Sequence, residues 1–175
     1  MDHNPILDLI HTRRSCRFFR PELPERTVLE AIIEAGRSAP SAKNAQKNHF
    51  YVLTNPAHLT AFTDIISRNI PAYEGKDCRF GAPALIVMTN LRESHNALQD
   101  VSCAMENMML AATALGVGSC WINQPLHLDA NEELRALLNV SEEERICASL
   151  ALGLPAKEPL TGPKDHPGNP VTWLE

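Results

Sequence analysis

The sequence predicts a single domain of the α/β or α+β class. Its 175 residues are the length of one domain, long enough to bury about two-thirds of the surface that the unfolded chain exposes. Helical segments with an apolar stripe interleave with short β-prone runs, and neither an internal repeat nor a linker divides the chain. Hydrophobic residues make up 44% of the chain and charged residues 21%, as in ordinary globular proteins. We therefore expect one domain over residues 1–175.

The N-terminal half is expected to hold three helices and one strand. Two of the helices begin at an Asn-Pro pair, with Asn4 and Asn55 as caps and proline in the first turn. The third follows from apolar residues recurring on one face, and the strand from aromatic and β-branched residues. In chain order the expected elements are helices over 4–12 and 24–37, a polar loop over 38–48, a strand over 49–54, a helix over 55–68 and a surface loop over 69–81.

The C-terminal half contains the predicted core. The run 82–89 is apolar without interruption, which is typical of a central strand buried on both faces. The segment 94–115 is apolar over most of its circumference, so we expect the longest helix there, ended by Gly116. The remaining expected elements are a strand over 117–122, a short helix over 129–138, a helical turn over 141–145 and a strand over 146–154.

Composition excludes several classes of protein. Sixteen Lys and Arg stand against twenty-one Asp and Glu, for a net charge of −5, which argues against a nucleic-acid partner. The five cysteines are odd in number and form no Cys-x-x-Cys pair, which indicates a reducing compartment without a disulfide framework. The start of the chain has no signal-peptide pattern, and no apolar run is long enough to cross a membrane. We expect a soluble, cytoplasmic protein without a membrane partner.

Motifs for metal, acyl-transfer and Rossmann dinucleotide sites are missing. The seven histidines show no ligand spacing, so no metal is expected. Ser119 lies in GVGSCW, which departs from Gly-x-Ser-x-Gly at Trp121. Gly116 and Gly118 follow a predicted helix and precede a strand, the reverse of the Rossmann order. These glycines are better explained as ending the helix and letting the strand approach another group closely.

Residues 13–20, RRSCRFFR, form the most unusual stretch of this acidic chain. Its four arginines are Arg13, Arg14, Arg17 and Arg20. Guanidinium groups offer paired donors that match phosphate oxygens at any working pH, and Ser15 adds a hydroxyl donor. Such a cluster repels itself unless an anion shares it, so the stretch is a candidate site for one phosphate group. The alternative is that these arginines are solvated or pair with nearby glutamates, of which Glu22, Glu25 and Glu30 are examples.

Four sequence blocks in order resemble the nitroreductase family of FMN-dependent oxidoreductases. RRSCRFF and APSAKNAQ are similar to the family's first two motifs, and QDVSCAMENMMLAATALGVGSCWI and ALGLPAKEP to its central helix and strand and its Leu-Gly-Tyr-Pro-Ala segment. The resemblance spans about residues 5–174. It implies a three-layer α-β-α sandwich of the α+β class around a central mixed sheet. It also implies a homodimer with FMN at the subunit interface and exchanged C-terminal arms, about 155–175. The apolar ending PVTWLE, which lacks a local packing partner, agrees with such an arm.

The resemblance further implies which residues hold FMN. The first block would bind the phosphate and ribityl chain, the Pro-Ser-x-x-Asn loop would lie by the flavin ring, and the glycine-containing strand would approach the ring through backbone groups. A basic residue of the arm would complete the phosphate site. The implied FMN-binding residues are Arg13, Arg14, Ser15, Arg17, Pro40, Ser41, Asn44, Gln46, Gly118, Ser119, Cys120 and Lys164. Lys47 and Asn48 stand where the family usually has Pro-Trp, so the packing under the flavin is expected to differ.

The activity implied by the resemblance needs no catalytic side chain, because the flavin carries the chemistry. NADH or NADPH would reduce the flavin at N5 and leave. A small electron-poor acceptor (a nitroaromatic, a quinone or an activated alkene) would then be reduced in a ping-pong cycle. Two alternatives stay open: a specialised FMN reaction such as dehalogenation, dehydrogenation or flavin cleavage, and a non-catalytic flavin-binding or sensing module. The sequence does not select between NADH and NADPH.

Overall fold

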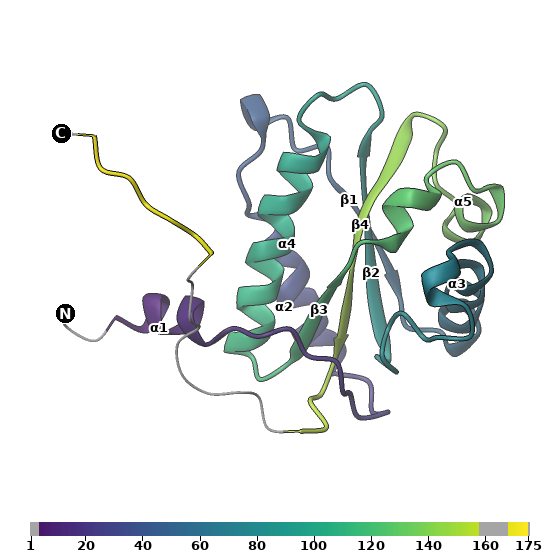
Figure 1. Cartoon of the computed structure of the whole chain (residues 1–175), viewed down its shortest axis with the longest axis horizontal. Helices are drawn as coiled ribbons and strands as arrows, with labels where there is room; N and C mark the ends of the chain where they lie inside the picture. Colours follow the sequence, from purple (N-terminus) through teal and green to yellow (C-terminus); the bar gives the residue numbers. More distant parts are fainter. Residues whose placement is uncertain (1–3, 158–167, 175) are drawn as a thin grey trace.

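The computed structural model describes residues 4–157 and 168–174, and its helices cover both faces of one sheet (Figure 1). The helices are α1 (Pro5–Thr12), α2 (Arg26–Arg37), α3 (Pro56–Asn69), α4 (Ala97–Ala114) and α5 (Glu132–Leu138). The strands are β1 (His49–Leu53), β2 (Ala84–Leu91), β3 (Gly118–Ile122) and β4 (Glu144–Gly153), with 3-10 turns at η1 (Ala42–Asn44), η2 (Pro71–Tyr73) and η3 (Gln124–Leu128). Helices α2 and α4 lie on one face of the sheet and α3 and α5 on the other, which confirms the three-layer α+β architecture.

The four strands form an antiparallel sheet in the order β1-β2-β4-β3. The prediction of a mixed sheet is therefore wrong for the named strands. In the described part of the chain, the one parallel pairing is an isolated bridge between Ser15 and Ser119. Alternation of helices and strands along a sequence indicates which elements follow one another. It does not fix the direction in which each strand returns across the sheet.

Strand β2 lies at the centre of the core, as predicted for residues 82–89. Its side chains alternate between two apolar clusters: Ile86 and Met88 pack towards α2 and α4, whereas Leu85 and Val87 pack towards α3 and α5. All four are fully buried. Each such side chain contributes about 1.5–3 kcal/mol of hydrophobic stabilisation relative to an exposed position. A strand buried on both faces cannot alternate apolar and polar residues, which explains its continuous apolar sequence.

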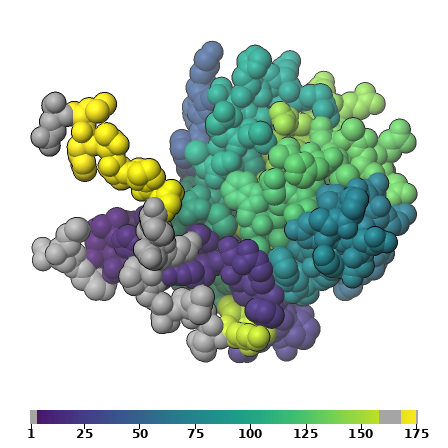
Figure 2. Space-filling model, viewed as in Figure 1, coloured from purple at the N-terminus to yellow at the C-terminus, as the bar shows by residue number. Residues whose placement is uncertain are grey.

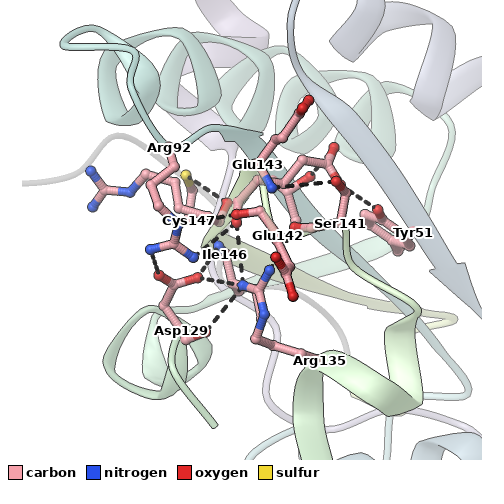
Figure 3. Close-up of polar contacts among 12 residues, drawn as sticks. Tyr51, Arg92, Asp129, Arg135, Ser141, Glu142, Glu143, Ile146 and Cys147 are labelled. Carbon is pink, nitrogen blue, oxygen red and sulfur yellow. Dashed lines mark hydrogen bonds and ion pairs between the residues drawn. The ribbon is translucent and has the colours of Figure 1, made fainter. Parts of the chain in front are cut away.

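Helix α5 begins later than the predicted start at Asp129. The side chain of Asn131 caps it instead, because the Asp129 carboxylate is already occupied. Asp129 accepts hydrogen bonds from Arg92 Nη1 at 2.7 Å, Arg135 Nη1 at 3.2 Å and the backbone N–H of Ile146 at 2.7 Å. Figure 3 shows Asp129 lying between the two guanidinium groups. This charged cluster fixes the end of η3 and the start of α5 to the first residues of β4.

The helical turn predicted over 141–145 is wrong, because Glu144 begins β4. Its carboxylate accepts hydrogen bonds from Tyr51 Oη at 2.7 Å and Thr89 Oγ1 at 3.0 Å, and lies 3.0 Å from His49 Nδ1. The carboxylate thus joins three strands. Burial acts to raise the pKa of Glu144, but the hydrogen bonds from Tyr51, His49 and Thr89 outweigh it and lower that pKa.

Helix α1 does not contribute to the core. Asn4 caps it through hydrogen bonds from two backbone N–H groups, as predicted, yet none of its residues is buried. Figures 1 and 2 show α1 and the C-terminal segment 168–174 projecting from the same side of the molecule. Across residues 4–157 and 168–174, none of the helices has the length and apolarity that crossing a membrane requires.

Candidate functional site

The arginine stretch leaves α1 and runs along the edge of β3. The chain turns out of the helix at Arg13, whose backbone is extended (φ −50°, ψ 131°). Ser15 then pairs with Ser119, and the N–H of Cys16 donates to the carbonyl of Ser119 at 2.8 Å. Further along, Phe19 pairs with the segment that follows β4. The sheet therefore fixes the backbone of this stretch, which makes its side chains a defined group.

Two arginines of the stretch have weak partners. Arg13 is only 15% exposed, and its Nε lies 3.6 Å from Glu106 Oε1, well beyond the 2.7–2.9 Å of a strong charged hydrogen bond. The Arg17 guanidinium lies 5.8 Å from the centroid of the Phe80 ring. No described carboxylate lies within 4 Å of Arg17. Both guanidinium groups therefore keep donor capacity for an anion.

The other two arginines are engaged with backbone carbonyls. Arg14 Nη1 donates to two carbonyls at the C-terminal end of α1, at 2.7 and 2.9 Å. Arg20 Nε donates to the carbonyl of Pro155 at 3.1 Å. Glu30, one of the glutamates considered as a partner for the cluster, pairs with Arg26 at 2.8 Å instead. Arg13, Ser15 and Arg17 are thus the members of the stretch best placed to share an anion.

Strand β3 presents small residues to this stretch. A Cβ at Gly118 would lie 2.8 Å from both Cβ and Sγ of Cys16, so the close approach expected at this glycine is confirmed. The Ser119 hydroxyl is buried without a hydrogen-bond partner among the described residues. Burial raises the pKa of the Cys120 thiol, against the opposing positive charge of Arg17 and Arg13. The raised pKa favours the protonated form of this packed thiol, which disfavours Cys120 as a nucleophile.

The second predicted group, loop 40–46, folds on itself. Ser41 Oγ accepts from the N–H of Gln46 at 3.0 Å, and Gln46 Nε2 donates to Asn44 Oδ1 at 2.9 Å. Pro40 is exposed at the start of the loop. The polar groups of this loop therefore lie close together at the surface.

The two predicted groups do not meet within one chain. The loop rests on the first turns of α4, where the N–H of Ala42 donates to Asp100 Oδ1. The arginine stretch pairs with β3, which begins beyond the other end of α4 at Ala114. Asp100 and Ala114 are about 21 Å apart along a helix axis, and Figure 1 shows the two stretches towards opposite ends of α4. Arg13 comes nearest to the loop, because its side chain reaches Glu106, about 9 Å along the axis from Asp100. Lys164 lies outside the described residues.

Sequence reasoning missed two polar residues beneath the loop, Asn90 and Asp100, and noted Asn48 only as a departure from the family pattern. Asn90 lies directly after the predicted apolar run of β2, and Asp100 lies in the first turn of α4; both are buried. A polar residue on the inward face of a predicted helix or strand is the signal that identifies such positions, because a buried polar group needs a partner. No cluster of three possible metal-ligating side chains occurs in the part of the chain that the structure describes.

Comparisons with known proteins point to one family. The sequence profile of the Nitroreductase family matches residues 10–154. An Archaeoglobus fulgidus protein, provisionally named an NADH dehydrogenase/NAD(P)H nitroreductase, is 30% identical over 156 residues, which cover 87% of this chain and 86% of that protein.

Solved structures agree. A Bacteroides fragilis nitroreductase with bound FMN is 32% identical with a TM-score of 0.90, over 99% of this chain and 100% of that chain. A nitroreductase with bound FMN from Desulfitobacterium hafniense is 26% identical with a TM-score of 0.82, also over 99% and 100% of the two chains.

Proposed function

The chain belongs to the nitroreductase family, and from this premise we propose that it is an FMN-dependent oxidoreductase using NADH or NADPH as electron donor. The observation that carries the proposal is the arginine stretch held along β3. A phosphate monoester is a dianion near neutral pH, and Arg13 and Arg17 supply two guanidinium groups without strong partners. Ser15, which lies between them in the sequence, adds a hydroxyl donor. FMN is the ligand bound in the similar structures from B. fragilis and D. hafniense.

The residues around the stretch fit such a ligand. Gly118 lets the arginine stretch lie against β3, and the unpartnered Ser119 hydroxyl is a spare polar group at the same place. Arg14 and Lys164 remain candidates for the phosphate, and Cys120 for backbone contact. The acidic chain outside this stretch disfavours other polyanions, so we assign no nucleic acid as a partner.

We propose that two copies of the chain complete each site. The partner subunit would supply Pro40, Ser41, Asn44 and Gln46, because these residues lie far from the arginine stretch of their own chain. A large unpartnered apolar surface favours such a homodimer: Ile6 of α1 is 68% exposed and Trp173 is 82% exposed. Exchange of the C-terminal arm, about 155–175, would cover both.

Bound FMN would supply the redox chemistry, taking a hydride from NAD(P)H and passing electrons to a nitroaromatic, quinone or activated alkene in a ping-pong cycle. The protein holds and orients the cofactor. Arg13 and Arg17 would neutralise the phosphate charge, and loop 40–46 would border the ring. We assign no side chain as acid, base or nucleophile, in agreement with the raised pKa of the Cys120 thiol.

Subunit complementation tests the proposal. Arg13→Ala/Arg17→Ala removes one half of each site, and Ser41→Ala/Asn44→Ala removes the other. We expect each homodimer to lose FMN. Coexpression with two affinity tags yields the heterodimer, in which one site combines both mutant halves and the other combines both intact halves. It should therefore bind FMN at about half the wild-type amount per chain. A heterodimer without FMN contradicts a shared site, and full FMN occupancy in the arginine variant contradicts the phosphate assignment.

A further inference from the structure

The loop between Ser41 and Gln46 holds a strained backbone. Lys43, Asn44 and Gln46 each have φ of 53°, the left-handed region that non-glycine residues rarely adopt. This conformation is unfavourable for L-residues, although Asn tolerates it better than most. Such strain persists only where the surrounding structure holds it, and it concentrates at functional sites. These three side chains are exposed, so apolar packing of the loop itself does not hold it.

A network of hydrogen bonds among Asp100, Asn48 and Asn90 (the relay) lies beneath the loop and holds both of its ends. On one side, Asp100 Oδ1 accepts from the N–H of Ala42 at 2.9 Å. On the other side, Asn48 Nδ2 donates to the backbone carbonyl of Asp100 at 3.1 Å. Asn90 Nδ2 donates to Asn48 Oδ1 at 2.7 Å. The loop is thus fixed at residues 42 and 48 to the first turns of α4 and to the end of β2.

The relay has an energetic cost that apolar residues would avoid. Asp100 is 5% exposed and Asn90 is fully buried, and a buried polar group is destabilising unless it is hydrogen-bonded. The Asn90 side chain is fixed further, because its Oδ1 accepts from the N–H of Leu91 at 2.7 Å. A fully bonded polar network specifies one conformation more strongly than apolar contacts do. These hydrogen bonds end at a strained and exposed loop, so the conformation that they specify is that of the loop.

We propose that Asp100, Asn48 and Asn90 are positioning residues that hold loop 41–46 in the conformation that receives the flavin. The proposal rests on the proposed function, in which this loop borders FMN. Ordering the loop during folding removes an entropic cost from cofactor binding. Asn48 stands where the family pattern has tryptophan, and in this chain its amide connects the loop to Asp100 and Asn90. None of the three residues need touch the cofactor.

Asn48→Leu tests the relay, because leucine has a similar size and removes both hydrogen bonds. Asn107→Leu is the matched control: Asn107 Nδ2 also donates to a backbone carbonyl at 3.1 Å, that of Ala35, and joins α4 to α2 away from the loop. FMN affinity is measured by fluorescence titration of the apoprotein, and flavin environment by visible circular dichroism. Asn48→Leu should raise the FMN dissociation constant about tenfold and change the dichroism. Asn107→Leu should leave both unchanged while lowering the melting temperature similarly.

Two substitutions of Asp100 differ in whether they keep a hydrogen-bond acceptor for the loop. Asp100→Asn keeps an oxygen for the N–H of Ala42 and should bind FMN like the wild type, whereas Asp100→Leu should weaken binding as Asn48→Leu does. If Asn48→Leu fails to fold, Asn48→Asp keeps the acceptor for Asn90, loses the donor, and should also weaken binding.

Wild-type FMN affinity and dichroism in folded Asn48 and Asp100→Leu variants would overturn the relay and leave the proposed function intact. Equal weakening in Asn107→Leu would also overturn it, because lost stability would then explain the effect. A wild-type protein that takes up no FMN overturns the proposed function itself.

Discussion

Gly118→Ala tests whether β3 positions the arginine stretch. The new Cβ would lie 2.8 Å from Cβ and Sγ of Cys16 and 3.3 Å from the carbonyl oxygen of Gly153, against 3.4 Å where ordinary contact begins. Cys16 is bound to β3 through the 2.8 Å hydrogen bond from its N–H to Ser119. The stretch must therefore move outward by about half an ångström or more, and Arg13 and Arg17 move with it.

The magnitude follows from two effects. Overpacking in a well-fitted region costs about 1–3 kcal/mol, and weakening one backbone hydrogen bond costs about 1 kcal/mol. We expect the free energy of unfolding to fall by about 2–3 kcal/mol, and the FMN dissociation constant to rise about tenfold or more because two phosphate donors are displaced. Urea denaturation of the apoprotein measures the first quantity, and fluorescence titration with FMN the second.

Gly116→Ala is the matched control. Gly116 has φ of +72° with no atom within 4 Å of the added Cβ, so alanine there costs about 1 kcal/mol of backbone strain without moving Cys16. It should lose stability but keep FMN affinity. Combining Gly118→Ala with Cys16→Gly removes the main clash and should restore most of the affinity. Unchanged FMN affinity in Gly118→Ala would refute the reasoning, since the stretch would then be independent of β3.

Two more predictions concern the dimer and pH. Truncation after Pro159 should weaken dimerisation and FMN retention together, because the removed arm would cover the apolar surface beside α1 and complete the site. Analytical ultracentrifugation measures the oligomeric state, and visible absorbance measures the bound FMN. A truncated protein that stays dimeric and keeps its full FMN content contradicts arm exchange. The lowered pKa of Glu144 means that its carboxylate stabilises the fold above the unfolded-state pKa of about 4.3 and loses this contribution as pH falls through the folded-state value. Glu144→Gln should therefore flatten the decline in unfolding free energy between about pH 5 and 3; an unchanged acid dependence in urea titrations would remove Glu144 as its cause.

The core was predictable because burial leaves a direct trace in sequence. The apolar run of β2 follows from contact on both faces of the sheet. Helix α4 is buried along one side, as its apolar residues predict, but its other side, which includes Leu98 and Cys103, is exposed. Turns were less predictable. SEEER has helix-forming composition, yet Glu144 joins the sheet because its carboxylate bonds to groups on two other strands. These hydrogen bonds are tertiary contacts, which local helix propensity cannot predict.

The residue types of the proposed site were visible in the sequence, but their arrangement was not. Four arginines in eight positions favour an anion site, and the structure adds that Arg14 and Arg20 donate to backbone carbonyls instead. That loop 40–46 and the β3-paired part of the arginine stretch lie towards opposite ends of α4 depends on how the chain crosses the sheet. The apolar stripe of α1 was also visible in the sequence, but a stripe does not reveal whether it faces its own core or another subunit. Asn48 and Asp100 each have polar neighbours in the sequence, and only the structure shows that they hold the loop through hydrogen bonds.

The most direct test of the central claim is the visible absorption spectrum of the purified protein, followed anaerobically on adding NADH and then NADPH. We predict flavin bands that bleach with at least one nucleotide, which identifies the donor in the same experiment. Flavin bands that bleach with neither nucleotide contradict the reductase activity and favour a flavin-binding module or a specialised reaction. A colourless protein that takes up no added FMN contradicts the account at its foundation, because Arg13 and Arg17 would then hold some other anion.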